Sequence, residues 1–284
     1  MLKVFLISLL LVHVKCDFMG LLDSENEADN SGNARIVGGS DAKERIPYQI
    51  SLQMQKSQNG GNPGIFGGLL QILSGSNNGR NFSHFCGGSV LNENHIVTAA
   101  HCIKGFNTSR MAVFAGTNDL REEDKGQRIM VDSCQIHPDY VELNTSDIAV
   151  CRLKESFSLG ENVSPIEMGT EYIDGGEECL LTGWGYTSRV VIGRRIPDKL
   201  QQSKFYSITN EECDQIYSTT RTELCTKSRG LEGACNGDSG GPLVCRNKLA
   251  GVVSYGLMIC GTNQPDVYTR VSELTDWIQE MSSI

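Results

Sequence analysis

The position of one serine relative to the histidines excludes one whole fold for this chain. Ser239 lies in the run Gly237-Asp238-Ser239-Gly240-Gly241, in which closely spaced glycines predict a tight turn that exposes the hydroxyl. The Gly-x-Ser-x-Gly spacing also fits the nucleophile turn of α/β-hydrolases, whose catalytic histidine follows the serine in the chain. All five histidines, at positions 13, 84, 95, 101 and 137, precede Ser239. An α/β-hydrolase fold is therefore excluded.

Two earlier segments supply the partners that a serine needs to become a nucleophile. A serine hydroxyl requires a neighbouring base, and that base requires an acid to orient it. His101 follows the apolar run 96–100, and Asp147 directly precedes the apolar run 148–151. The chain therefore presents a candidate base, acid and nucleophile in the order His101, Asp147, Ser239.

Five short motifs place these residues in a family context. They are Ile36-Val37-Gly38-Gly39, Thr98-Ala99-Ala100-His101-Cys102, Asp147-Ile148-Ala149, Gly183-Trp184-Gly185 and Gly237-Asp238-Ser239-Gly240-Gly241-Pro242. In this order the chain resembles the chymotrypsin/trypsin-like serine proteases from residue 36 to residue 284. The resemblance implies an all-β fold of two antiparallel β-barrels, with a boundary near residue 165, and serine endopeptidase activity.

The resemblance also implies a role for each catalytic residue. Ser239 attacks a peptide carbonyl, His101 takes and returns the proton, and Asp147 orients the imidazole. The backbone N–H groups of Gly237 and Ser239 form an oxyanion hole, and Ser254 supports Asp147. A non-catalytic homologue acting as a binding module is the alternative. Such a protein typically lacks one residue of the triad, and this chain has all three.

The first 35 residues predict a secreted precursor. Residues 1–16 combine Lys3 with an apolar run too short to span a bilayer, as in a signal peptide. Residues 17–35 are acidic and end on Arg35, which predicts a flexible propeptide removed by a trypsin-like protease. Cleavage would give Ile36 a new ammonium group, and the resemblance implies that it pairs with Asp238. A plain linker that happens to end in arginine is the alternative.

Cysteine usage indicates an oxidising compartment. Of the eleven cysteines, Cys16 falls at the end of the signal peptide, and ten cysteines in a secreted chain indicate disulfides rather than metal ligands. The remaining Cys134 and Cys151 lie outside the family pattern, on segments that we expect to pair as antiparallel strands. They form a fifth bridge or remain free thiols. The resemblance implies four other pairs: Cys86–Cys102, Cys179–Cys245, Cys213–Cys225 and Cys235–Cys260.

Short apolar segments separated by turns predict strands at 49–53, 96–100, 111–115, 148–153, 179–182, 242–245, 249–255 and 267–271. Near the C-terminus, apolar residues from Leu274 to Met281 have helical spacing, which predicts an amphipathic helix with Ser272 as its N-cap. The Gly-rich insertion 54–83 is longer than the corresponding loop of the family. Its apolar run 65–73 favours packing against another surface, and a tolerated surface insertion is the alternative.

The residues expected in the primary specificity pocket depart from two familiar types. By resemblance, Gly233 stands at the pocket base, where trypsin-like enzymes carry aspartate and chymotrypsin-like enzymes carry serine. A carboxylate is present instead at Asp266, Gly256 leaves the opening wide, and Tyr255, next to Ser254, replaces the usual tryptophan. This set resembles the brachyurins, arthropod proteases of broad specificity. It predicts cleavage after bulky apolar and basic residues, and a narrow chymotrypsin- or elastase-like specificity is the alternative.

The remaining features concern modification and partners. The formal net charge of −9 excludes the basic character typical of nucleic-acid binding. Thr117 and Gln127 stand where trypsins have calcium-binding glutamates, so we expect no metal and no other cofactor. The expected partners of this secreted, extracellular and monomeric protein are protein or peptide substrates, an activating protease and protein inhibitors, with no nucleic acid and no membrane. Four sequons mark candidate glycosylation sites at Asn81, Asn107, Asn144 and Asn162.

Overall fold

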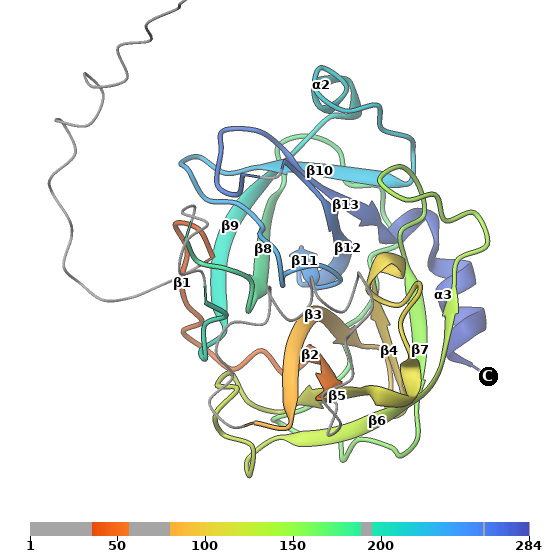
Figure 1. The fold of residues 1–284 in the computed structure, drawn as a ribbon. Helices are drawn as coiled ribbons and strands as arrows, with labels where there is room; N and C mark the ends of the chain where they lie inside the picture. Colours follow the sequence, from red (N-terminus) through yellow and green to blue (C-terminus); the bar gives the residue numbers. More distant parts are fainter. Residues whose placement is uncertain (1–35, 57–79, 189–194, 258, 284) are drawn as a thin grey trace, which may run out of the picture. The chain divides into compact units, whose positions relative to one another are not determined.

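The computed structural model of the chain describes residues 36–56, 80–188, 195–257 and 259–283. The predicted signal peptide, the propeptide with Arg35 and most of the Gly-rich insertion (57–79) lie outside the described residues. The regular secondary structure of the described part is mostly β-strand, and the strands close into two antiparallel six-stranded barrels, with one short helix at the C-terminus (Figure 1). The predicted fold class is confirmed.

The first barrel contains the strands drawn from orange to yellow-green in Figure 1, in the order β2-β3-β4-β7-β6-β5. Side chains alternate along β2, so that Ile50 and Leu52 lie in the hydrophobic core of this barrel, while Ser51 and Gln53 are buried on its other face. The strands are β2 (Gln49–Gln55), β3 (Phe82–Val90), β4 (His95–Thr98), β5 (Met111–Ala115), β6 (Gln127–Ile136) and β7 (Ala149–Leu153).

The second barrel follows in the sequence and is drawn from green to blue in Figure 1. It has the order β9-β10-β13-β12-β11-β8 and closes because β8 also pairs with β9, while the short β1 (Ser40–Asp41) extends β9 at one edge. Leu181, Phe205 and Tyr268 are fully buried in its core. The strands are β8 (Glu178–Gly183), β9 (Gln201–Ile208), β10 (Glu223–Lys227), β11 (Pro242–Cys245), β12 (Lys248–Tyr255) and β13 (Asp266–Arg270).

The connection between the barrels runs from Leu153 to Glu178. Within it, the N–H of Ile166 donates to Val90 in β3 of the first barrel. Three residues later, the N–H of Gly169 donates to Leu249 in β12 of the second barrel. The chain therefore changes partners between barrels within a few residues of position 165.

The predicted C-terminal helix is present as α3 (Thr275–Ser282), but its predicted N-cap is wrong. Ser272 lies instead in a 3-10 turn, η3 (Val271–Glu273), and its buried hydroxyl has no hydrogen-bond partner among the described residues. The turn brings Leu274 and Ile278 into the core of the first barrel, and α3 contacts β4 and β7. Burial of these apolar residues, rather than side-chain capping, therefore sets the start of the helix.

The other helical segments of the described chain are short. No helix found there is long and apolar enough to cross a membrane. The three segments are η1 (Ala100–Cys102), η2 (Thr108–Arg110) and α2 (Asn210–Cys213).

Five disulfides join the ten cysteines that follow the predicted signal peptide. The bridge outside the family pattern, Cys134–Cys151, links directly opposed residues of β6 and β7, and its sulfur atoms are 1.98 Å apart. The other four bridges are Cys86–Cys102, Cys179–Cys245, Cys213–Cys225 and Cys235–Cys260.

Candidate active site

Strand pairing in the first barrel brings His101 and Asp147 together. β4 and β7 are antiparallel, with Thr98 opposite Ala149. His101 lies three residues after Thr98, in η1, and Asp147 lies two residues before Ala149. Both side chains therefore emerge at the same end of this strand pair, although they are 46 residues apart in the sequence.

Four hydrogen bonds hold Asp147 in place. Its Oδ2 lies 2.7 Å from His101 Nδ1, and its Oδ1 accepts from the His101 backbone N–H at 2.9 Å. Two further bonds come from the second barrel: Ser254 Oγ donates to Oδ2 at 2.6 Å, and Thr269 Oγ1 donates to the Asp147 carbonyl at 2.8 Å. Burial opposes ionisation of this carboxyl, but the hydrogen bonds and charge of His101 and the Ser254 bond outweigh it and lower its pKa. Asp147 is therefore a stable carboxylate that fixes the imidazole.

Ser239 is presented by a tight turn that presses against the first barrel. Its carbonyl accepts from the N–H of Gly87 in β3 at 2.7 Å. Gly240 has a φ of +78°, and a Cβ there would lie 2.2 Å from Thr98 Oγ1 in β4. Only glycine allows this approach. The turn therefore places the serine beside the strand that leads to His101.

The arrangement has the parts of a nucleophilic catalyst acting on a carbonyl. No hydrogen bond joins Ser239 Oγ to the His101 ring in this structure, although both residues are described, and such bonds often tighten only when substrate binds. Gly237 has a φ of +102°, and among the described residues neither its N–H nor that of Ser239 has a hydrogen-bond partner. Two free N–H groups flanking a nucleophile can stabilise an oxyanion.

The carboxylate of Asp238 is fully buried beside the serine. It accepts from the N–H of Gly185 at 2.7 Å and from that of Cys235 at 2.9 Å, and no cation contacts it in the described part of the chain. Burial raises its pKa to about 7, against the effect of these two bonds. Ile36 and Val37 are buried as well, and Val37 forms a β-bridge with Gly233. The start of the protease-like segment is thus packed into the second barrel.

Asp266, Gly233 and Gly256 lie together, although they come from three segments. Asp266 Oδ2 accepts from the N–H of Ala234 at 2.8 Å. A Cβ on Gly256 would lie 3.0 Å from its Oδ1, and a Cβ on Gly233 would lie 3.6 Å from its Oδ2. Burial raises the pKa of Asp266 to about 7, Ala234 opposes this, and the charge of Asp238 adds to it. The carboxyl group therefore lies between the two glycines.

Tyr255, the last residue of β12, is half-buried one position before Gly256. Its ring packs edge-on against Tyr217, with centroids 5.6 Å apart. The Tyr217 hydroxyl donates to the carbonyl of Pro265, the residue before Asp266. The two tyrosines thus form one wall beside the Asp266 carboxyl.

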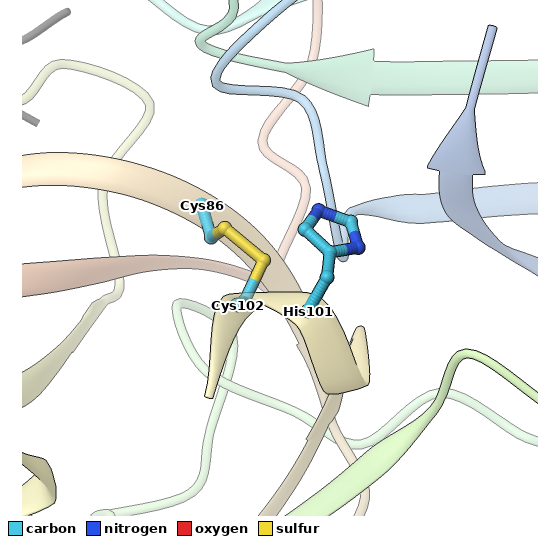
Figure 2. Close-up of side chains that lie close together, drawn as sticks. All are labelled: Cys86, His101 and Cys102. Atoms are coloured by element: carbon cyan, nitrogen blue, oxygen red, sulfur yellow. A yellow bond between two sulfur atoms is a disulfide. The ribbon is translucent and has the colours of Figure 1, made fainter. Parts of the chain in front are cut away.

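Three residues of the site have atoms that metals often bind. Figure 2 shows the His101 ring beside the Cys86–Cys102 disulfide. The two sulfur atoms and a ring nitrogen of His101 lie within 4.8 Å of one another. The two sulfurs are 1.99 Å apart in a disulfide, so neither offers a thiolate ligand. At the positions compared with the calcium loop, Thr117 donates to Glu122, and Gln127 hydrogen-bonds to the backbone of Ser158. These side chains are thus committed to protein partners.

Two residues near the site were not found by sequence reasoning. His84 Nε2 lies 2.9 Å from the carbonyl oxygen of Gly237, and Thr269 holds the backbone of Asp147. In the sequence, only its position two residues before Cys86 points to His84 as a site residue. No sequence feature points to Thr269. The asparagines of the four sequons, Asn81, Asn107, Asn144 and Asn162, are all exposed.

Comparisons with known proteins agree with this geometry. The family model named Trypsin matches residues 36–278. Chymotrypsin-2 of Vespa crabro is 32% identical over 249 residues, which cover 86% of this chain and 99% of that protein. Trypsin of Xenopus laevis is 33% identical over 256 residues, which cover 88% and 91%. Among solved structures, mouse neuropsin, a serine protease expressed in the limbic system, has a TM-score of 0.67 at 28% identity, covering 83% of this chain and 94% of its own.

Proposed function

The chain belongs to the trypsin family of serine proteases and is a serine endopeptidase, and we propose that it is a secreted zymogen of broad specificity. Its substrates are proteins or peptides, as for the family. The observation that carries the catalytic assignment is the placement of His101, Asp147 and Ser239 at one junction of the two barrels, with Asp147 bonded from both. We further propose that it acts as a monomer and is cut by another protease.

In the proposed mechanism, Ser239 Oγ attacks the substrate carbonyl carbon while His101 Nε2 takes its proton. Asp147 bonds Nδ1 of the same ring at 2.7 Å, which fixes the tautomer that leaves Nε2 free to accept. The N–H groups of Gly237 and Ser239 bind the oxyanion that forms. His101 then gives the proton to the departing amine, and water repeats the sequence to release the acyl group.

The proposed activation rests on the buried Asp238. A buried carboxylate without a cation is costly, and its raised pKa reflects that cost. Cleavage after Arg35 would create an ammonium on Ile36, whose side chain is already buried in the second barrel. An ion pair between this ammonium and Asp238 would stabilise the turn from Cys235 to Ser239. Activity should therefore appear only after cleavage.

The proposed specificity rests on the site of Asp266. Between Gly233 and Gly256, its carboxyl group can pair with a lysine or arginine side chain of the substrate. When it is protonated, the same space accepts an apolar side chain without burying a charge. This arrangement supports broad specificity more than a narrow chymotrypsin- or elastase-like preference.

One experiment tests activation and catalysis together. Brief trypsin treatment of the secreted precursor should release a chain that begins Ile-Val-Gly-Gly and should switch on both peptidase activity and labelling by a fluorophosphonate. The Arg35→Gln variant should stay uncut between residues 35 and 36, remain folded and show no peptidase activity. Full activity in the uncut chain would contradict the zymogen proposal, whereas a cut chain that neither turns over peptide nor reacts with the probe would favour a binding module.

A further inference from the structure

A row of polar side chains crosses the outer face of the first barrel. Ser51 on β2, Phe114 on β5 and Arg128 on β6 are successive partners in the strand register, and Gln53 on β2 lies opposite His84 on β3. In β2, the alternating Ile50 and Leu52 point into the barrel core. The polar residues therefore share the face that also carries the contact between His84 and Trp184 of the second barrel.

These side chains form one continuous chain of hydrogen bonds. Arg128 Nε donates to Gln53 Oε1 at 3.0 Å, and Gln53 Nε2 donates to Ser51 Oγ at 3.1 Å. Ser51 Oγ lies 2.8 Å from His84 Nδ1, and His84 Nε2 lies 2.9 Å from the carbonyl oxygen of Gly237. Gln53, Ser51 and His84 are each at most 5% exposed. The chain thus begins at a cation and ends at the turn that carries the nucleophile.

The direction of every bond in this chain is fixed by its two ends. Arginine can only donate, so Gln53 must present its oxygen to Arg128 and its amide N–H to Ser51. The Gly237 carbonyl can only accept, so His84 must carry a proton on Nε2. Burial lowers the pKa of His84 to about 4, and a neutral ring has a single N–H, so Nδ1 must accept from the Ser51 hydroxyl. All four bonds therefore point toward Gly237.

Arg128, the first residue of this series of hydrogen bonds, is itself held in place by its neighbours. Its guanidinium carbon lies 4.9 Å from the ring centre of Phe82 and 4.7 Å from that of Phe114. Its side chain is 20% exposed, and Glu123 contacts it at 3.4 Å from a more exposed position. Stacking on two rings fixes the plane of the guanidinium, which leaves Nε directed at Gln53.

We propose that Arg128 and Gln53 are positioning residues for the oxyanion-binding turn, a proposal that rests on the proposed function. They act through Ser51 and His84. They hold His84 as an Nε2–H donor, and that donor holds the Gly237 carbonyl. Gly237 has a φ of +102°, and each peptide group beside it has one other backbone bond: the Asp238 N–H donates to the Cys235 carbonyl at 2.9 Å, and the Asn236 carbonyl accepts from the Tyr186 N–H at 3.0 Å. The bond from His84 is therefore one of three that orient the peptides on either side of Gly237. A rotation of these peptide groups would move the Gly237 N–H away from the oxyanion.

The test is a substitution that reverses the direction of these hydrogen bonds with almost no change in side-chain shape. In Gln53→Glu, the new carboxylate can only accept, so it accepts from both Arg128 and the Ser51 hydroxyl. Ser51 Oγ then accepts from His84 Nδ1–H. A neutral His84 consequently has no proton on Nε2 for Gly237. The matched variant Gln53→Met breaks the chain without reversing it, which leaves the Nε2–H tautomer available.

Two readouts separate positioning from ordinary structural damage. ¹⁵N NMR of histidine-labelled full chain, in a Ser239→Ala background, should report Nε2–H for His84 in the parent and in Gln53→Met. Gln53→Glu should instead report Nδ1–H with an unprotonated Nε2, whereas a doubly protonated ring, which keeps the Nε2–H, would count against the proposal. In the activated enzyme, kcat should fall about tenfold or more in Gln53→Glu with KM within about twofold, because one oxyanion donor accounts for roughly 10²–10³ in rate. Gln53→Met should lose less.

Arg128→Met, which removes the guanidinium and keeps an unbranched apolar side chain, should resemble Gln53→Met. Arg110→Met is the control, since Arg110 donates to the backbone carbonyl of Gln55, its one hydrogen-bond partner among the described residues, and should leave kcat unchanged. Equal loss of kcat in Gln53→Glu and Gln53→Met, or an unchanged His84 tautomer in Gln53→Glu, would overturn the proposal. A parent enzyme without turnover would contradict the proposed function alone, because the tautomer is read without activity.

Discussion

The ionisation of Asp266 should decide which side chain the enzyme prefers before the scissile bond. If this carboxyl group lines the specificity pocket, a substrate with lysine at that position selects the ionised form. A substrate with norleucine, which has the same stem without the charge, selects the neutral form. The ratio of kcat/KM for lysine over norleucine should therefore rise as the pH rises through about 7.

The size of the effect follows from the surroundings of the carboxyl. Burial raises the pKa of Asp266 from its ordinary 3.8 to about 7, opposed by the Ala234 N–H and reinforced by the charge of Asp238. A shift of about three units corresponds to on the order of 4 kcal/mol for ionising the group. The ionised fraction falls from about 0.9 at pH 8 to about 0.1 at pH 6 while the neutral fraction rises in step, so the lysine-to-norleucine ratio should fall about a hundredfold over that range.

The assay compares two peptides that differ only at this residue, from about pH 6 to pH 8. Because kcat/KM reports ionisations of the free enzyme, any ionisation that affects both substrates equally cancels in the ratio. Asp266→Asn keeps the shape of the side chain and removes the titration. It should give a low ratio that does not change with pH.

Two results would refute this reasoning. A flat ratio in the parent enzyme would mean that Asp266 does not titrate in contact with the substrate side chain. A slope that persists in Asp266→Asn would mean that another group, such as the neighbouring Asp238, causes it. Either result would also remove the basis for the proposed broad specificity.

Two further predictions concern catalysis and stability. Ser239→Ala should lower kcat by several orders of magnitude with unchanged circular dichroism, and a residual rate above that of water should come from the oxyanion-binding N–H groups; near-normal turnover would contradict the nucleophile assignment. Joint replacement, Cys134→Ser with Cys151→Ala, should lower the free energy of unfolding by about 3 kcal/mol, because the bridge closes a short loop of 17 residues. Chemical denaturation measures this change, and a loss of turnover larger than the loss of folded protein would show that the bridge also shapes the site.

Sequence patterns were most informative where the chemistry is local. The strands that lead to His101 and from Asp147 are short apolar runs, and their observed bounds in β4 and β7 fall within a few residues of the prediction. β9, with the sequence Gln-Gln-Ser-Lys-Phe-Tyr-Ser-Ile, was not predicted, because it buries few apolar side chains. β6 was expected only as a strand around Cys134, because an irregularity between Val131 and Ser133 interrupts its alternation.

Features that depend on distant contacts could not be read from the chain. His84 lies close to the nucleophile only because β2 and β3 pair and because the turn at Gly237 packs against them; the two residues are 153 positions apart. Ser272 has the residue type of an N-cap, but burial of its neighbours places it in a 3-10 turn. In both cases, tertiary packing overrides local preference.

Because hydrogen bonds from both barrels hold Asp147, turnover depends on how the two barrels are aligned. The carboxylate is anchored in the first barrel, while Ser254 and Thr269 reach it from the second. The apolar cluster of the first barrel also includes Leu249 and Val252 of β12, so side-chain packing as well as these hydrogen bonds aligns the two barrels. Spectroscopic signals of folding report the barrels, whereas turnover reports their alignment. A library of variants sorted for intact folding and lost turnover would therefore map the docking surface, including positions that touch no substrate.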